Sequence, residues 1–302
     1  MINKKQLKKI FSYIFVIVIF GFMFKVLFDN AAQLRDYDWV GINYFYVAIS
    51  FLFLLLAFVG VVFAFQTLLG SFGVRIKLMK VASIISLANL GRFVPGKVWA
   101  VLGMVHFGRK HGISGYVSST CLFVSIILTS IAAFFVFVVS LPFWPTLPGN
   151  FHYIYIVLLA VALIVFIQPP IFNRIVSYMF KKLKKKDFVS ELTYKTIIML
   201  FGVYVLVWMF NGTAFYLLVS AISPQPLAHI LPIIGIYTIS WVIGLYSFLT
   251  PGGLGVREGI ISALLATYVT YPVAIVIAII SRIWILLFQG AVAAYFLKEH
   301  RN

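Results

Sequence analysis

Long runs of apolar residues, separated by shorter polar or charged segments, dominate the pattern along the chain. A membrane-spanning helix needs about 20 mostly apolar residues. Six runs of this kind predict transmembrane helices, at residues 10–28, 40–69, 117–141, 153–168, 196–222 and 272–297. Two further apolar stretches, 81–107 and 228–270, are interrupted near their middles by Pro and Gly. The pattern therefore predicts an all-α polytopic membrane protein.

The composition excludes a soluble fold for most of the chain. Hydrophobic residues make up 63% and charged residues 10% of the 302 residues, against about 45–50% and about 25% in soluble proteins. The net charge is +17, but much of the basic excess lies between apolar runs, where it orients the chain and attracts anionic lipid. We therefore expect the membrane, and no nucleic acid, as partner. The single cysteine, Cys121, excludes a disulfide framework and a multi-cysteine metal site, and we expect no metal and no cofactor.

Basic residues predict the orientation of the chain, because Lys and Arg are enriched in cytoplasmic segments. They gather before residue 10, at residues 75–80, in the loop 174–195 and after residue 297. The segments 29–39, which is acidic, and 142–150, which is uncharged, are expected outside. These assignments agree only if 81–107 (the first hairpin) and 228–270 (the second hairpin) each enter and leave the membrane on one side. We expect six transmembrane helices, two oppositely oriented re-entrant hairpins, and both termini on the cytoplasmic side of the plasma (inner) membrane.

An internal repeat supports this topology. The dipeptide Pro95-Gly96 in the first hairpin recurs as Pro251-Gly252 in the second, 156 positions later (251 − 95). The same offset carries two predicted spans onto two others, 40–69 onto 196–225 and 117–141 onto 273–297. We therefore expect a single membrane domain, 1–302, in which an inverted-topology repeat of 40–141 and 196–297 is separated by the cytoplasmic basic loop 174–195. Inverted repeats with interrupted helices are typical of transporters that bind substrate near mid-membrane.

Four cations are predicted in or beside segments at membrane depth: Arg92, Lys97, Arg257 and Arg282. A charge at the bilayer centre costs roughly 2.5–3.5 kcal/mol on insertion scales, so we expect these side chains to face a polar cavity, a partner or a head group. Pro95 favours the first turn of a new half-helix, and a second half-helix is expected near Gly255. Free N–H groups and the positive dipole ends would point at each apex, which predicts an anion site. A snorkelling or structurally paired Arg282 is the alternative.

Glu258 is the only acid embedded in apolar sequence, and it lies beside Arg257 in the first turn of the expected half-helix. Three interpretations are open. The carboxylate can complement the helix dipole and pair with a cation. It can restrain Arg257 or Arg282 until a phosphate displaces it, or it can take part in proton coupling.

Two segments resemble the lysylphosphatidylglycerol synthase transmembrane family: Gly-Arg-Phe-Val-Pro-Gly-Lys at 91–97 and Thr-Pro-Gly-Gly-Leu-Gly-Val-Arg-Glu-Gly at 250–259. Its members are flippase-like membrane domains, found in aminoacyl-phosphatidylglycerol synthases and as stand-alone proteins. The resemblance covers nearly the whole chain and implies a lipid-flipping role for the hairpins. The substrate-binding residues that it implies are Arg92, Pro95, Gly96, Lys97, Pro251, Gly252, Arg257 and Glu258. Because the sequence ends at Asn302, we expect a stand-alone member without the cytosolic aminoacyltransferase domain.

The leading interpretation is a lipid flippase or scramblase, and not an enzyme. Its substrate would be a phosphate-bearing lipid: a phospholipid, an aminoacyl phospholipid or a polyprenyl-phosphate-linked lipid. Stand-alone relatives often look associated with polyprenyl-linked sugars or envelope glycans, so envelope-lipid biosynthesis enzymes are candidate partners. A secondary transporter for a small anion would use the same architecture around a closed aqueous cavity. Two further alternatives are an integral-membrane transferase or hydrolase and a structural partner in an envelope-synthesis complex.

Overall fold

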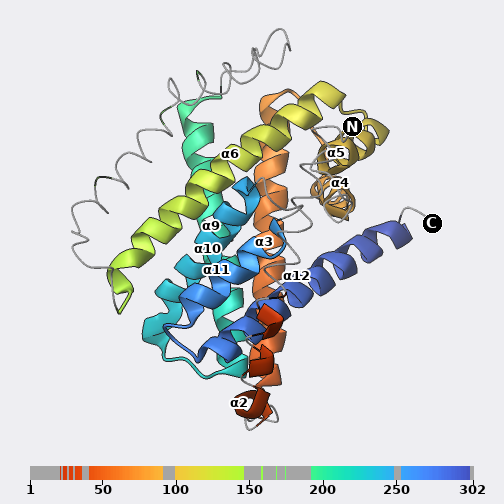
Figure 1. Ribbon diagram of the computed structural model, residues 1–302. Helices are drawn as coiled ribbons and strands as arrows, with labels where there is room; N and C mark the ends of the chain where they lie inside the picture. Colours follow the sequence, from red (N-terminus) through yellow and green to blue (C-terminus); the bar gives the residue numbers. More distant parts are fainter. Residues whose placement is uncertain are drawn as a thin grey trace, which may run out of the picture.

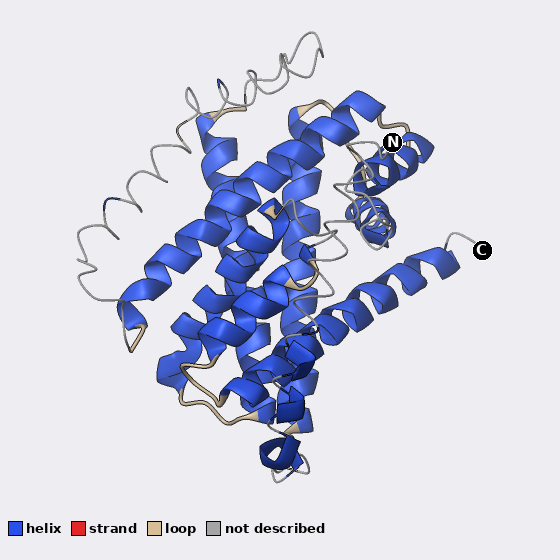
Figure 2. Ribbon diagram, viewed as in Figure 1, coloured by secondary structure: helices blue, strands red, loops and turns tan. Residues whose placement is uncertain are grey.

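The computed structural model describes residues 41–90, 99–145, 192–247 and 253–299, parts of 21–35, and positions 158, 168 and 174. All regular secondary structure in these residues is helical (Figure 2), as predicted for an all-α protein. Most of the predicted spans 10–28 and 153–168 and of the basic loop 174–195 lies outside the described residues. So do the hairpin apices, residues 91–98 and 248–252.

Four long helices coincide with four of the predicted spans, and each is long and apolar enough to cross a membrane. They are α3 (Tyr44–Ser71), α6 (Gly115–Ser140), α9 (Tyr194–Ile222) and α12 (Tyr271–Glu299). The shortest, α6, has 26 residues, which at 1.5 Å per residue gives about 39 Å and exceeds the roughly 30 Å hydrocarbon core of a bilayer. Three of the four begin after a polar N-cap whose side-chain oxygen accepts a backbone N–H, as N-caps do: Asn43, Ser114 and Thr193.

A fifth helix is also long and apolar enough to cross a membrane. It runs over Leu227–Tyr246 and consists of the short 3₁₀ turn η3 (Leu227–His229) followed by α10 (Ile230–Tyr246). The sequence pattern assigns these residues to the first arm of the second hairpin, and helix length alone does not distinguish a crossing helix from such an arm. The part of the chain that the structure describes thus holds five candidate membrane spans, and the protein is a multi-pass membrane protein.

Shorter helices flank the two hairpin apices. In the first hairpin α4 (Leu78–Leu90) packs against α5 (Trp99–Lys110), and in the second α10 packs against α11 (Val256–Leu265). Helices α4, α5 and α11 have 13, 12 and 10 residues, fewer than the roughly 20 of a bilayer crossing. Helix α11 begins directly after Gly255, which is where the sequence predicts a helix to begin.

The long helices form a central bundle on which the shorter ones pack. Helices α3 and α9 make the most extensive helix–helix contact among the described residues and run side by side (Figure 1). Helix α10 lies against α6, and α4 lies against α12. Each hairpin therefore contacts the long helix that follows the other hairpin in the sequence. The enclosed core includes Phe65, Tyr204 and Phe215.

Polar side chains join the helices inside this apolar core. Trp208 of α9 donates from Nε1 to the carbonyl oxygen of Thr129 in α6 at 2.8 Å. Trp284 of α12 donates to Oγ of Ser50 in α3 at 3.0 Å. Such bonds across helices are common in membrane proteins, because an unpaired polar group in hydrocarbon is costly. They tie α6 to α9 and α3 to α12.

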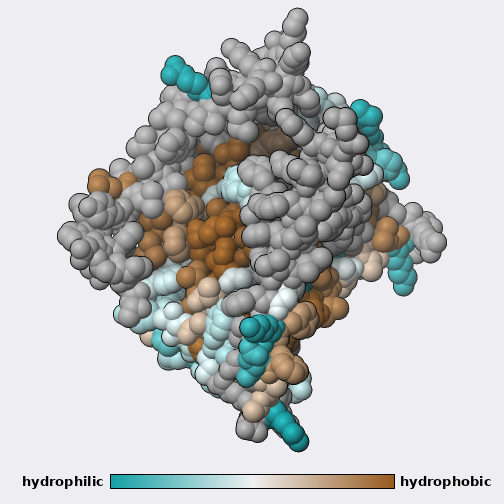
Figure 3. Space-filling model, viewed as in Figure 1, coloured by the Kyte–Doolittle hydropathy of each residue, from teal (hydrophilic) through white to brown (hydrophobic). Residues whose placement is uncertain are grey.

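The outer surface is apolar where lipid is expected. On α3 the side chains of Leu52, Val59 and Phe63 are 54%, 46% and 42% exposed. Figure 3 shows apolar surface across the middle of one face, with the strongly hydrophilic side chains near its edges. Exposed apolar surface of this extent is unfavourable in water but carries no such cost in a bilayer. The hydrocarbon core therefore acts as the solvent for this bundle.

Candidate anion-binding site

The second hairpin re-enters helical structure through a turn that only glycine accommodates. Gly253 and Gly255 have φ of 71° and 80°, a backbone region that side chains with a Cβ disfavour. A Cβ on Gly253 would lie 2.7 Å from the carbonyl oxygen of Gly244, near the end of α10. The turn thus lies directly on the end of α10, and α11 starts beside it.

Glu258 lies in the first turn of α11 and is 2% exposed. Its Oε2 accepts a hydrogen bond from the backbone N–H of Gly255 at 2.7 Å. A carboxylate here satisfies one of the free N–H groups at the start of the helix and complements the positive end of the helix dipole. This contact agrees with the first interpretation of Glu258, in which the carboxylate complements the helix dipole and pairs with a cation.

The other oxygen of Glu258 faces a cation from a different helix. Nε of Arg282, in α12, lies 3.7 Å from Oε1 of Glu258, and the Arg282 side chain is 22% exposed. Neither of these two atoms has a hydrogen-bond partner among the described residues. The pair is therefore an ion pair without a direct hydrogen bond, and Glu258 links the start of α11 to α12.

Arg257 is the least satisfied charge of the group. Its side chain is 8% exposed, and its guanidinium carbon lies 4.6 Å from the ring centroid of Tyr237 in α10. Nε and Nη2 of Arg257 are buried and have no hydrogen-bond partner among the described residues. Burying a charged group without hydrogen bonds is costly, so these two N–H donors indicate a place for an acceptor.

The charges of this cluster do not cancel. Two guanidinium groups, Arg257 and Arg282, stand against the single carboxylate of Glu258, which leaves one positive charge in excess. An oxyanion near Arg257 would balance that charge and accept the unused N–H donors. The described residues contain no group of three or more His, Cys, Asp or Glu side chains that could hold a metal ion. The arrangement favours anion binding.

The structure brings together three of the predicted site residues: Arg257, Glu258 and Arg282. The other six lie outside the described residues, so their part in the site stays a prediction: Arg92, Pro95, Gly96, Lys97, Pro251 and Gly252. Helix α4, which leads toward the first apex, packs on α12, which carries Arg282. Tyr237 was not among the predicted residues, because one aromatic residue in an apolar run is indistinguishable from a core residue.

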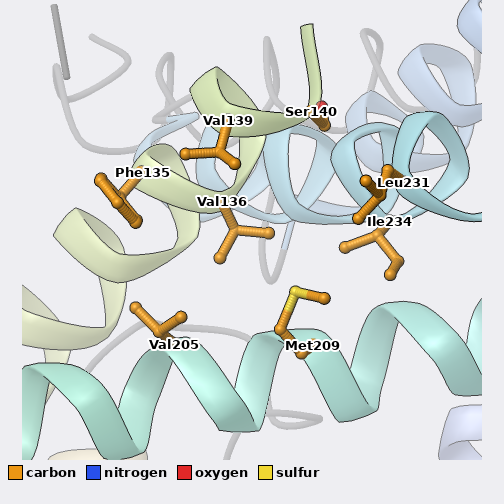
Figure 4. A pocket seen from close by; sticks show the side chains of 8 residues that line it. All are labelled: Phe135, Val136, Val139, Ser140, Val205, Met209, Leu231 and Ile234. Atoms are coloured by element: carbon orange, nitrogen blue, oxygen red, sulfur yellow. The ribbon is translucent and has the colours of Figure 1, made fainter. Parts of the chain in front are cut away.

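An apolar cavity of about 100 Å³ lies between α6, α9 and α10 (Figure 4). Its lining is hydrocarbon apart from the hydroxyl of Ser140, which donates to the carbonyl oxygen of Phe137 and accepts from the indole of Trp144. A charged head group would find no free donor there. The cavity is therefore separate in character from the charged cluster at α11.

A second polar cluster lies at the other end of α10. Nδ1 of His229 is 2.9 Å from Oε1 of Gln225, and the His229 ring packs edge-on against Tyr268. The hydroxyl of Tyr216 donates to the carbonyl oxygen of Gln225 at 2.8 Å. Burial raises the pKa of Tyr268 to about 12. The cluster ties the segment after α9 to the turn between α11 and α12.

Comparison with known proteins identifies the family of this chain. No match was found among curated proteins. The family described as the lysylphosphatidylglycerol synthase TM region matches residues 10–293, which is most of the chain and includes both hairpins. The predicted resemblance to this family is thereby confirmed, and the match suggests a lipid-related function in the membrane. This protein belongs to the lysylphosphatidylglycerol synthase TM-region family.

Proposed function

We propose that the protein is a flippase or scramblase that moves a phosphate-bearing lipid between leaflets. The observation that carries the proposal is the buried Arg257, whose Nε and Nη2 lack partners among the described residues, next to the ion pair of Glu258 and Arg282. A lipid phosphate would supply the missing acceptor. The acyl or prenyl chains would stay in the bilayer while the head group passes the hairpin apices. The proposal assigns binding and transport to this site and no chemical step.

The order of the helices supports an inverted repeat. Under the offset of 156 positions, α4 (Leu78–Leu90) falls on residues 234–246, within α10, and α6 (Gly115–Ser140) falls on 271–296, within α12. The packing is reciprocal as well, because α10 contacts α6 and α4 contacts α12. Two such halves in opposite orientation would give four spans, with α4/α5 and α10/α11 as re-entrant hairpins. With the predicted spans 10–28 and 153–168, the chain would cross the plasma (inner) membrane six times.

The topology is testable by cysteine labelling. In a Cys121→Ala background, we expect an external membrane-impermeant reagent to label Pro148→Cys but not Lys184→Cys in intact cells. The reason is the basic loop 174–195, which the proposal places in the cytoplasm together with both termini. Labelling at 184 and not at 148 would contradict the orientation and, with it, the inverted repeat.

In the proposed cycle Glu258 restrains Arg282. While the site is empty its carboxylate holds Arg282, and a phosphate that binds to Arg257 competes with Glu258 for the Arg282 guanidinium. Arg92 and Lys97 would receive the head group at the first apex, between the turns at Pro95-Gly96 and Pro251-Gly252. Two apices facing opposite sides of the membrane would thus offer cations along one route. The cytoplasmic lysines would attract anionic lipid to it, at about 1 kcal/mol per nearby charge.

Binding and flipping in reconstituted vesicles test the proposal. We expect Arg257→Ala and Arg282→Ala each to weaken binding of a fluorescent phosphatidylglycerol roughly 10- to 150-fold, since a charge-assisted contact contributes about 1.5–3 kcal/mol. Arg75→Ala is the matched control, because Arg75 is exposed in the segment between α3 and α4. Near-normal binding and flipping in both site variants, each well folded, would contradict the anion site.

The same vesicles separate a lipid transporter from a transporter of soluble anions. If lipid is the substrate, we expect phosphatidylglycerol to compete for the site and inorganic phosphate to compete weakly. Strong competition and uptake of inorganic phosphate, without lipid movement, would instead support a secondary transporter for a small anion.

A further inference from the structure

We propose that Tyr237 is a positioning residue that presents one edge of Arg257 for two-point recognition of a phosphate. This inference rests on the proposed function and adds to it how the head group is held. The flat faces of a guanidinium group favour contact with aromatic rings, and its edges carry the N–H donors.

In this protein the face and the edge of Arg257 are used separately. The guanidinium carbon lies 4.6 Å from the Tyr237 ring centroid. The two buried atoms without a partner among the described residues are Nε and Nη2, and these share one edge. Their N–H bonds run parallel, which is the geometry that binds two oxygens of one carboxylate or phosphate.

The ring of Tyr237 is itself held firmly. It is 3% exposed, stacks on Phe215 of α9 with centroids 4.9 Å apart, and lies 6.4 Å from the ring of Trp208. Two aromatic neighbours from another helix thus restrict the tyrosine, and the tyrosine in turn restricts the plane of the guanidinium. A pre-oriented donor loses less conformational freedom when the ligand binds.

Helix α10 contacts both the Cβ and the guanidinium group of Arg257. A Cβ on Gly244 would lie 3.3 Å from Cβ of Arg257, so α10 passes close to the Arg257 backbone there. Gly244 and Tyr237 are seven positions apart on α10, which places them on one helix face two turns apart. Glu258 does not use the free edge, because its oxygens contact the Gly255 N–H and Arg282.

The expected ligand is an anion that presents two oxygens to the Nε and Nη2 donors of Arg257. The non-bridging oxygens of a phosphodiester head group fit the two parallel donors, and inorganic phosphate shares that chemistry. A lysine would keep the charge at this position but lose the fork. The inference therefore concerns the geometry of recognition as well as the charge.

Fluorinated phenylalanines at position 237 test the role of the ring. Each added fluorine weakens the negative ring face with little change of shape, so a packing role would be unaffected. In nanodiscs with phosphatidylglycerol in phosphatidylcholine, we expect Tyr237→Phe to bind nearly normally and affinity to fall stepwise with fluorination, in total about 2- to 30-fold. In an Arg257→Gln background the same series should have no further effect. A flat series in the native background would overturn the inference.

Arg257→Lys tests the two-point contact independently. We expect at least a roughly tenfold loss of affinity although the charge is kept. Binding equal to the native protein would overturn the two-point contact. If Arg257→Gln leaves binding unchanged, the proposed function fails; if it weakens binding while the fluorine series is flat, only the role of Tyr237 fails. Phosphatidylglycerol and inorganic phosphate as separate probes distinguish a lipid from a free anion.

Discussion

The two hairpins share a Pro-Gly apex with cations nearby, but their charges are balanced differently. The first hairpin contains Arg92 and Lys97 and no acid, whereas the second contains Glu258 beside Arg257. Glu258 caps α11 and contacts Arg282 of α12. The second hairpin therefore contains a carboxylate, Glu258, that balances part of its positive charge. Because Glu258 also caps α11, the local structure of this hairpin depends on its charged residues. The first hairpin has no such internal partner, so we expect its cations to act on ligand more than on folding.

The hairpins also differ in shape. The arms α4 and α5 have 13 and 12 residues, whereas α10 and α11 have 17 and 10. Helix α10 contacts Arg257 through both Tyr237 and Gly244. One long arm thus provides a platform for the charged first turn of the short arm.

The largest expected effect concerns the turn of the second hairpin. We expect Gly253→Ala to destabilise the protein by about 2–5 kcal/mol, because it adds a Cβ at positive φ and against the Gly244 carbonyl. Gly259→Ala is the matched control: its Cβ would meet no atom within 4 Å, and alanine is favoured in a helix. Thermal unfolding in detergent, followed by loss of the monodisperse peak, measures both. Equal stability of the two variants would show that the turn has a different structure.

The next effect concerns the counter-charge. We expect Glu258→Gln to lower stability by about 1–3 kcal/mol, because it leaves a partly buried Arg282 without its ion pair. If Glu258 restrains the arginine, phosphatidylglycerol binding should be kept or tightened and its release slowed. Asp29→Asn, at an exposed acid, is the control. Lower stability with unchanged binding and release would show that Glu258 only complements the helix dipole and does not restrain Arg282.

The smallest expected effect on stability concerns the cations of the first hairpin. Arg92→Ala and Lys97→Ala should change unfolding by no more than about 0.5 kcal/mol, since the first hairpin sequence contains no acid for them to pair with. Lipid flipping should nevertheless fall clearly in both, if these cations receive the head group. The paired measurement is thermal unfolding and vesicle flipping on the same preparation. A large loss of stability with normal flipping would assign these residues to folding alone.

The apolar runs were sufficient to predict four long helices, and the Pro and Gly residues that interrupt the second hairpin indicated the start of α11 near Gly255. Apolar length acts locally, so its effect is visible in the sequence. The role of α10 was less predictable, because η3 and α10 together form a 20-residue apolar helix, which is long enough for a span and also suits a hairpin arm. Orientation within the membrane depends on the whole charge distribution, which stays a prediction here.

For the candidate site, too, the sequence predicted some features and the tertiary structure determined others. From the sequence alone came the class of the protein, the apex motifs, and the expectation that Arg257, Glu258 and Arg282 are functional, because charged residues in apolar segments are costly and therefore rare. Only the tertiary structure decided which charges meet: Glu258 pairs with Arg282, 24 positions away (282 − 258), and its neighbour Arg257 packs on Tyr237. Those partners come from different helices, and their proximity depends on how α10, α11 and α12 pack. No local sequence pattern predicts that packing, because the apolar face of one helix can pack equally well against several other helices.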